Sequence, residues 1–388
     1  MDKETLSVCS AIALNSIFGY EPRFSHGIIS SLGSAEAVFC LSEREKIEIF
    51  GPFNKFVHQI NDESLMAAQE SYRRLTDQGC RVCTIFDEGY PELLRDCDDA
   101  PLVLYVRGSG DFRTIFGRKS VSVVGTRDIS LYGQEWCTRI VRSLAQTEDR
   151  PVITSGLAIG VDITAHRAAL DCGLPTIAVL PCGIDDVYPA RHRKDAARIA
   201  STPGCALITD YPPGTAPVAF NFLRRNRIIA GLSGATVLVE SKAKGGGTMT
   251  ARLASDYGRD VFALPGRIDD LRSSGCNRLI AEKIAEPIDN LARLADSLGM
   301  GRYRHTRAAD LGASICAHFQ GRLPDEQIAT ACAIAEKIRK SRGIDIDTLC
   351  SELDLSYAAV STLAAALESD GFIIMDLMQR CTINAGNY

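Results

Sequence analysis

Six short apolar runs rich in β-branched residues, each ending in a glycine or a polar loop, constrain the fold of this chain most strongly. They recur about every 25 to 30 residues, and each is followed by a helix-like stretch. This spacing is what a strand, a crossover helix and a parallel strand require, so we predict a doubly wound α/β domain. The runs are SVSVVG from residue 120, PVITSG from 151, PTIAVLP from 175, CALITD from 205, ATVLVE from 235 and DVFALPG from 260.

The length of 388 residues is enough for two or three domains, and the pattern changes along the chain. Residues 1–78 have apolar residues at helical spacing and are predicted to form a small helical, SAM-like domain. The α/β domain is expected over 79–290. A segment of weak periodicity, 291–324, is interpreted as a linker, and 325–388 as a winged-helix-like domain.

The last domain is inferred from its order of elements, which resembles a winged helix-turn-helix, a module that often places a helix in the DNA major groove. However, the segment Ile344 to Met378 contains seven acidic residues and no Lys or Arg, so phosphate would repel it. We therefore expect a protein-interaction or packing role. The predicted elements are helices Gln327–Arg339, Asp347–Leu353 and Ser356–Asp370, then strands Phe372–Leu377 and Arg380–Asn384.

Composition places the chain among ordinary globular proteins, with 46% hydrophobic and 23% charged residues. A net charge of -5 argues against a wholly basic nucleic-acid coat, yet a groove needs only a local excess of cations. No apolar stretch approaches the roughly 18 residues of a spanning helix, and the first residues are acidic, which predicts a cytoplasmic protein without a membrane partner.

Fourteen scattered cysteines indicate reduced thiols. Cys80 and Cys83 form the only C-x-x-C pair, but a strand would send them to opposite faces, so no metal site is expected.

Three glycine-containing loops follow predicted strands, and in a parallel sheet such loops meet along one edge, where ligands bind. In the first, Arg127 precedes a helix that begins near Leu131. In the second, Gly156 and Gly160 would let backbone N–H groups approach an anion, and Asp162 would orient the loop. The third, KAKGGGT, contains Lys242, Lys244 and three consecutive glycines, Gly245, Gly246 and Gly247, with Thr248 as a candidate N-cap.

The segment FNFLRRNRIIAGLSGATVLVE places three arginines, Arg224, Arg225 and Arg227, in the expected first turn of a short helix. Cations there oppose the helix dipole, so something should offset them. One explanation is a solvated face or ion pairs with acidic residues, and the other is a bound polyanion. Phe222 and Tyr188 could offer ring faces for bases or belong to the core.

Several motifs of common enzymes are absent. The chain has no G-x-x-x-x-G-K-[ST], G-x-G-x-x-G, H-E-x-x-H or G-x-S-x-G, which disfavours an ATPase, a dehydrogenase, a zinc protease and a serine hydrolase. His166 falls inside a predicted helix, where packing is a better explanation than catalysis. No catalytic residue and no cofactor are predicted.

Several stretches of the chain resemble the motifs of the DNA-processing protein A family (DprA, also called Smf). The matching stretches occur in the family's order over about residues 85 to 285. They are DEGYPELL with PLVLYVRG, SVVGTRDISLYG, VITSGLAIGVDITAHRAAL, VLPCGIDDVYP, FLRRNRIIAGLSGATVLVE, GGGTMTARLASDYGRDVFALPG and SGCNRLI.

The resemblance implies an extended Rossmann-like domain that binds single-stranded DNA, protects incoming DNA and loads the RecA recombinase in natural transformation or recombination. It also implies homodimers and no established catalytic reaction. The family's DNA-contacting arginine falls on Arg127, and its R-N-R triplet on Arg225, Asn226 and Arg227. The full set of expected DNA-binding residues is Arg127, Gly156, Gly160, Phe222, Arg224, Arg225, Asn226, Arg227, Lys242, Lys244, Gly245, Gly246, Gly247 and Thr248.

The chain also departs from the family. Many members have a lysine where this chain has Ile159, so Lys242 or Lys244 would have to replace one phosphate contact. Many members also have a Gly-Ala pair where this chain has Lys283 and Ile284. The alternative function is a nucleoside monophosphate phosphoribohydrolase, because those enzymes have similar glycine loops. Their P-G-G-x-G-T motif is followed by a catalytic glutamate, whereas GGGTMTAR here has no acidic residue until Asp256.

Overall fold

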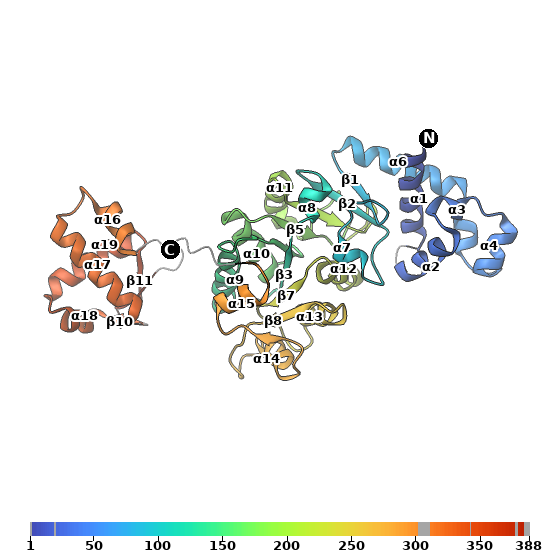
Figure 1. Cartoon of the computed structure of the whole chain (residues 1–388). Coiled ribbons are helices and arrows are strands. Elements are labelled where there is room, and N and C mark those ends of the chain that lie inside the picture. Colours follow the sequence, from blue (N-terminus) through green and yellow to red (C-terminus); the bar gives the residue numbers. More distant parts are fainter. Residues whose placement is uncertain (1, 19–20, 302–310, 342, 377–378, 384–388) are drawn as a thin grey trace. The chain divides into compact units, whose positions relative to one another are not determined.

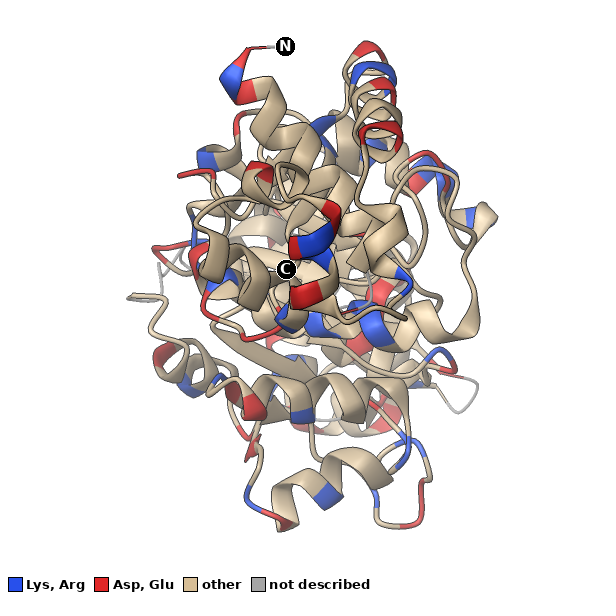
Figure 2. Cartoon of the chain, turned by 90° about the vertical axis from the view of Figure 1, so that its right-hand side faces the viewer, with Lys and Arg blue, Asp and Glu red and all other residues tan. Residues whose placement is uncertain are grey.

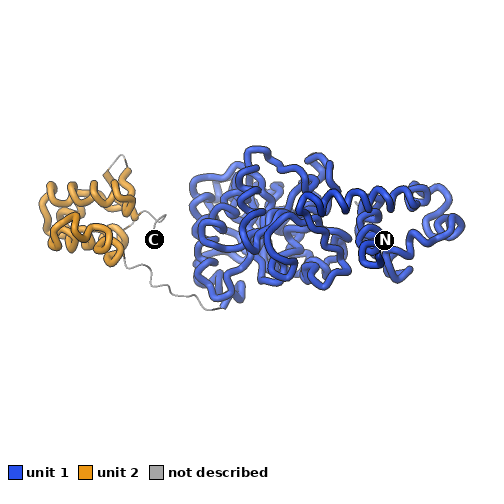
Figure 3. The backbone as a smooth tube through the Cα atoms, turned by 90° about the horizontal axis from the view of Figure 1, so that it is seen from above, with its two compact units in different colours: residues 1–303 blue, residues 304–388 orange. Residues whose placement is uncertain are grey.

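A computed structural model describes the chain over residues 2–18, 21–301, 311–341, 343–376 and 379–383 (Figure 1). The chain divides into two compact units, residues 1–303 and 304–388, which Figure 3 distinguishes by colour. None of the described helices is both long enough and apolar enough to cross a membrane. Basic and acidic residues are interspersed along the ribbon (Figure 2).

The first unit contains a nine-stranded sheet in the order β1-β2-β6-β5-β4-β3-β7-β8-β9. β1 and β2 form an antiparallel extension, and all strand pairs from β6 to β9 are parallel. All six apolar runs are strands, which confirms the predicted doubly wound, Rossmann-like fold. The strands are β1 (Arg81–Thr84), β2 (Val103–Gly108), β3 (Ser120–Val124), β4 (Val152–Ser155), β5 (Thr176–Val179), β6 (Ala206–Thr209), β7 (Ala235–Leu238), β8 (Asp260–Ala263) and β9 (Glu286–Pro287).

Helices cover both faces of the sheet, because alternate side chains of a strand point to opposite faces. Val121 and Val123 of β3 share one core with α9, α10 and α15, whereas Val124 shares another core with α12, α13 and α14. The helices of this region are α7 (Glu92–Arg95), α8 (Phe112–Phe116), α9 (Leu131–Leu144), α10 (Val161–Asp171), η1 (Ala190–His192), α11 (Arg193–Ser201), α12 (Ala219–Gly231), α13 (Gly246–Asp256), α14 (Ser274–Ala281) and α15 (Leu291–Ser297).

The strand order contains a switch point beside β3. From β3 the chain proceeds outward through β4, β5 and β6, and then returns to place β7 and β8 on the other side of β3. The loops that leave the carboxyl ends of β3 and β7 therefore diverge, which opens a crevice of the kind in which doubly wound folds bind ligands.

The helical head ends close to the predicted boundary at residue 78, but it belongs to the same compact unit as the sheet. Leu14 of α1 and Tyr105 of β2 lie in one apolar core, and buried Asn15 donates its side-chain N–H to the backbone oxygen of Asp210 at 2.9 Å. The head consists of α1 (Lys3–Phe18), α2 (Pro22–Leu32), α3 (Ala35–Phe39), α4 (Glu43–Phe50), α5 (Phe56–Gln59) and α6 (Asp62–Asp77).

The predicted linker at 291–324 is wrong at both ends. Its first part forms α15, which packs against α9 in the first unit, and its last part includes α16 (Leu311–Phe319), which packs against α17 in the second. The periodicity of apolar residues is weak in both helices, because each is short and buries only a few side chains, such as Leu294 in α15 and Ile315 in α16. Neither helix was therefore predicted. Residues 302–310 lie outside the described part.

The second unit has the predicted order of three helices followed by two strands, with α16 and β10 in addition. Its small sheet has the order β10-β12-β11. Leu377 and Asn384, the ends of the two predicted strands, lie outside the described residues. The elements are α17 (Asp325–Lys340), β10 (Ile344–Asp345), α18 (Ile346–Leu353), α19 (Tyr357–Ser369), β11 (Ile373–Met375) and β12 (Arg380–Ile383).

Two smaller expectations also have clear outcomes. Cys80 and Cys83 lie in different apolar cores, as expected for residues three apart near a strand. Lys283, where many family members have glycine, adopts a left-handed conformation with φ of 58°, a region that glycine enters most easily.

Candidate functional site

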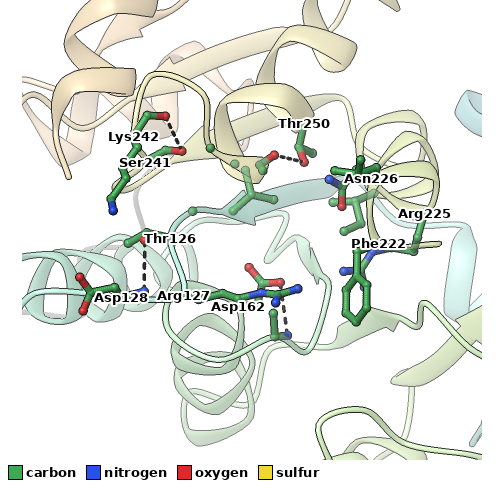
Figure 4. Close-up of a pocket in the computed structure, with 18 of the residues that line it drawn as sticks. Thr126, Arg127, Asp128, Asp162, Phe222, Arg225, Asn226, Ser241, Lys242 and Thr250 are labelled. Carbon is green, nitrogen blue, oxygen red and sulfur yellow. Dashed lines mark hydrogen bonds between the residues drawn. The ribbon is translucent and has the colours of Figure 1, made fainter. Parts of the chain in front are cut away.

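A cleft of about 840 Å³ opens at the carboxyl ends of β3 and β7, at the switch point of the sheet (Figure 4). Segments that are distant in sequence form its walls: the loops after β3, β4 and β7 and the first half of α12, with single residues from the loops after β5 and β6. The lining residues are Val124, Gly125, Thr126, Arg127, Asp128, Ala158, Asp162, Tyr188, Pro217, Ala219, Phe222, Leu223, Arg225, Asn226, Ile229, Ser241, Lys242, Lys244, Gly245, Gly246, Gly247 and Thr250.

Glu240 holds the loop after β3 in place, and sequence reasoning missed this residue. Its buried carboxylate accepts hydrogen bonds from the backbone N–H of Ser130 at 2.9 Å and from the Ser130 hydroxyl at 2.5 Å. Its backbone oxygen accepts a bond from Thr126 N at 2.7 Å. The only sequence signal was an acidic residue at the end of an apolar strand, ATVLVE.

Arg127 extends from this loop and is exposed. Its guanidinium lies over the ring of Phe222, 4.8 Å from the centroid, and the Phe222 ring meets the Tyr188 ring edge-to-face at 5.2 Å. A cation over an aromatic face is attracted by about 0.5 to 2 kcal/mol, which orders the arginine without neutralising it. Phe222 is half-buried and Tyr188 is exposed, so both rings belong to the cleft wall.

The loop after β7 brings two further exposed cations, Lys242 and Lys244, to the same cleft. Among the ion pairs of the described residues, none involves either lysine or Arg127. We call these three residues the rim cations. Their positive potential is therefore available to a ligand.

The N-terminus of α13 also faces the cleft. Gly245 is its N-cap, and the backbone N–H groups of Gly246 and Gly247 make no hydrogen bond within the part of the chain that the structure describes. Free N–H groups and the helix dipole together favour an anion. The prediction that Thr248 is the N-cap is wrong. It lies inside the helix, where its hydroxyl donates to the Lys242 backbone oxygen at 2.9 Å.

The loop after β4 is turned toward the protein rather than toward a ligand, which corrects the expectation for Gly156 and Gly160. The N–H of Gly156 donates to the Asp162 carboxylate at 3.2 Å, and this confirms the orienting role of Asp162. Gly160 has φ of +87°, and a Cβ there would lie 2.2 Å from the Thr126 backbone oxygen. Gly160 therefore permits close backbone packing below the cleft, and Gly156 leaves room for the Arg225 guanidinium, which a Cβ would meet at 2.6 Å.

The arginine segment differs from the prediction in position and in environment. Helix α12 begins at Ala219, so its arginines lie in the middle of the helix and not in its first turn. Arg225 is only 3% exposed. It donates to the backbone oxygen of Gly156 at 2.8 Å and to that of Val179, so it joins the ends of β4 and β5.

Burial dominates the electrostatics around Arg225. It lowers the pKa of this arginine to about 10, although the nearby Asp162 carboxylate opposes the shift. Burial likewise raises the pKa of Asp162, despite attraction from Arg225. Arg225 and Asn226 line the cleft, but the Arg225 guanidinium forms its floor and is directed into the protein.

Arg227 and Arg224 face away from the ligand edge toward an acidic residue. Buried Asp210 accepts an ion-paired hydrogen bond from Arg227, which also donates to the Asp99 backbone oxygen. Arg224 lies 3.9 Å from the same carboxylate. The expectation that these two arginines bind a polyanion is therefore not supported by the geometry, because both lie against the Asp210 carboxylate, as the alternative explanation of ion pairs held.

His166 is fully buried, and its Nδ1 lies 2.7 Å from the Thr176 hydroxyl. Burial, with a smaller contribution from the charge of Arg225, lowers its pKa to about 3. It is therefore neutral at neutral pH, in agreement with the predicted packing role. Within the described residues, no three His, Cys, Asp or Glu side chains are grouped as a metal site.

The sequence matches one protein family and several of its members. Residues 81–299 match the family model of DNA recombination-mediator protein A. The DNA processing protein DprA of Streptococcus pneumoniae is 39% identical over 199 residues, which cover 51% of this chain and 68% of that protein. Protein Smf of Escherichia coli is 40% identical over 210 residues, which cover 53% of this chain and 54% of that protein.

Solved structures agree with these matches. The structure of the Streptococcus pneumoniae protein superposes with a TM-score of 0.54 at 32% identity, covering 66% of this chain and 92% of that one. DNA processing protein A from Helicobacter pylori, described for its single-stranded DNA binding mode, gives a TM-score of 0.50 at 31% identity. It covers 56% of this chain and 95% of the other.

Proposed function

The chain belongs to the DNA recombination-mediator protein A family, and from this premise we propose that its cleft binds the backbone of single-stranded DNA. One observation carries the proposal. Three exposed cations without an acidic partner among the described residues and the free N–H groups of one helix N-terminus surround a single cleft at the sheet's switch point. Such an arrangement recognises phosphate.

The phosphates are assigned to the rim cations and to the backbone N–H groups of Gly246 and Gly247. These contacts read the charge of the backbone and not the bases, so binding should be largely independent of sequence and should weaken with salt. The exposed face of Tyr188, with the ring of Phe222 beside it, provides apolar surface for bases. Unpaired bases can reach such rings, whereas stacked bases in a duplex cannot, and this favours a single strand.

The floor residues are assigned a supporting role. Arg225 fixes the ends of β4 and β5, and Glu240 fixes the loop that carries Arg127. Both act on the shape of the cleft and not on the DNA directly.

The test is fluorescence anisotropy with a labelled oligonucleotide, competed with unlabelled single strands, blunt duplex and mononucleotides. We expect single strands to compete best. Equal competition by duplex would contradict the preference for single strands. Release of free base from nucleoside monophosphates would instead support the phosphoribohydrolase alternative.

We also propose that the chain forms a homodimer through the connection between β8 and α14. Ile268 and Leu271 are 97% and 73% exposed there, and Leu131 of α9 is 86% exposed. The hydroxyl of Tyr132 donates to the Pro265 backbone oxygen at 2.9 Å, which joins the two segments into one surface. Contiguous exposed apolar residues are typical of interfaces. Light scattering should give a dimer mass, and I268D should give a monomer that still melts normally.

The wider role is proposed from the family. The bound strand would be protected and passed to the RecA recombinase in the cytoplasm during transformation or recombination. The corresponding measurement is the rate of RecA filament assembly on strands covered by a single-strand binding protein, with and without this protein. No acceleration would contradict the loading role and leave the DNA-binding proposal standing.

A further inference from the structure

Two thiols meet on the surface of the second unit. Cys316 of α16 and Cys332 of α17 have their Sγ atoms 3.6 Å apart (the two helices are labelled in Figure 1). This is contact distance for two sulfur atoms, and a disulfide bond of about 2.05 Å requires only a modest approach of the side chains. The two helices form a hairpin whose packing holds the pair together.

The pair is also accessible, unlike most thiols of this chain. Nine of the fourteen cysteines are buried, whereas Cys316 is exposed and Cys332 is half-buried. Cys40, the other exposed cysteine, lies in the helical head of the first unit. Reactivity toward oxidants follows exposure, because the thiolate must meet the oxidant.

We propose that Cys316 and Cys332 are an oxidation site at which a peroxide forms a reversible intramolecular disulfide. The Cys316 thiolate attacks one peroxide oxygen, the O–O bond breaks, and hydroxide leaves, which gives a sulfenic acid. The Cys332 thiol then attacks the Cys316 sulfur, and the sulfenic oxygen leaves as water with the proton of that thiol. For hydrogen peroxide, two thiols and one peroxide become one disulfide and two waters. A dithiol reductant reverses the change.

The bond would fix α16 to the rest of its unit. α16 has nine residues and is held by three buried apolar side chains, Leu311, Ile315 and Phe319. A helix this short has little stability of its own, so its position depends on those contacts. The disulfide would close the loop between the two helices and so lower the conformational entropy of the unfolded ensemble. Unfolding of this unit, which separates α16 from α17, would then be less favourable. This inference is independent of DNA binding.

The experiment treats the full-length protein with hydrogen peroxide under native conditions. Peptide mapping by mass spectrometry should find the peptides of Cys316 and Cys332 joined, with the loss of two hydrogen atoms. Dithiothreitol should restore both thiols. The melting transition of the second unit should rise on oxidation and return on reduction.

Matched variants separate this site from general oxidation. C316S and C332S should each abolish the cross-link, and C350S, which removes a half-buried thiol of the same unit, should leave it intact. Irreversible oxidation of Cys316 to the sulfinic acid with Cys332 still reduced would overturn the proposal. Cross-links only between different protein molecules would overturn it as well.

Discussion

The exposed cations at the cleft rim and the buried arginines of α12 differ in almost every physical respect. The rim cations are exposed and have no acidic partner among the described residues. The buried arginines are Arg225, which forms the cleft floor, and Arg227, which faces away from the cleft. They are 3% and 6% exposed and donate to backbone oxygens or to Asp210. An arginine in a motif can therefore act as a structural element whose several donors join loops, while neighbouring cations bind the ligand.

This difference predicts separate consequences for substitution. Loss of a buried arginine leaves buried acceptors without a donor, so it should lower the free energy of unfolding first and DNA affinity as a result. Loss of a rim cation removes a solvated charge, so it should lower affinity and leave stability nearly unchanged.

The largest effect is expected for Arg225→Ala. The backbone oxygens of Gly156 and Val179 lose their donor, and Asp162 loses its favourable charge, so the free energy of unfolding should fall by about 3 kcal/mol. Urea unfolding measures this. Arg44→Ala, which removes an exposed arginine of α4 outside the cleft lining, is the control and should change stability by less than about 0.5 kcal/mol. A fully stable Arg225→Ala protein would break the comparison.

A smaller effect is expected from the pH dependence of stability that buried His166 causes. The native pKa of His166, about 3, is below its unfolded value, so the unfolded state binds more protons as the pH falls below about 6.5. Stability should therefore decrease with falling pH. Between pH 7 and pH 5 the wild type should lose about 2 kcal/mol more than His166→Gln.

The subtraction isolates this histidine, because Asp162, whose raised pKa acts in the opposite direction, is present in both proteins. Urea unfolding at a series of pH values provides the measurement. Parallel stability curves for the two proteins would show that His166 takes up a proton in the native state.

The smallest effect is expected for Gly246→Ala, and it should have opposite signs for stability and for binding. A Cβ at Gly246 meets no protein atom within 4 Å, so stability should rise by about 0.5 kcal/mol. The added methyl group lies in the cleft lining and should lower DNA affinity several-fold. Gly27→Ala, an equally open position in α2, should raise stability without changing affinity. Unchanged affinity in Gly246→Ala would remove the α13 N-terminus from the site.

Much of the fold follows from local sequence. The six strands were predicted because β-branched runs at the spacing of crossover connections are compatible with few other folds. Because loops that leave parallel strands meet along one edge of the sheet, Arg127, Lys242 and Lys244 were expected near one another, and they line one cleft. The exposure of these three residues was not predicted, because charge alone does not distinguish solvent from an ion pair.

Other features depend on distant partners. Arg227 of α12 is paired with Asp210, which directly follows β6, and the Arg225 acceptors come from the ends of β4 and β5. Glu240 acts through Ser130, more than one hundred residues earlier in the chain. Such pairings depend on the folded sheet, so the spacing of residues within a motif does not show them.

The most direct measurement of the central claim is the salt dependence of single-strand affinity after all three rim cations are replaced by alanine. Anisotropy titrations over a series of salt concentrations give the slope of log affinity against log salt. A control protein with Arg73→Ala, Arg113→Ala and Arg293→Ala loses the same number of exposed positive charges outside the cleft lining. If the rim binds phosphate, the slope becomes shallower by about 2 in the rim variant, and stays unchanged in the control. Equal slopes in wild type and rim variant, with both folded, would contradict the account.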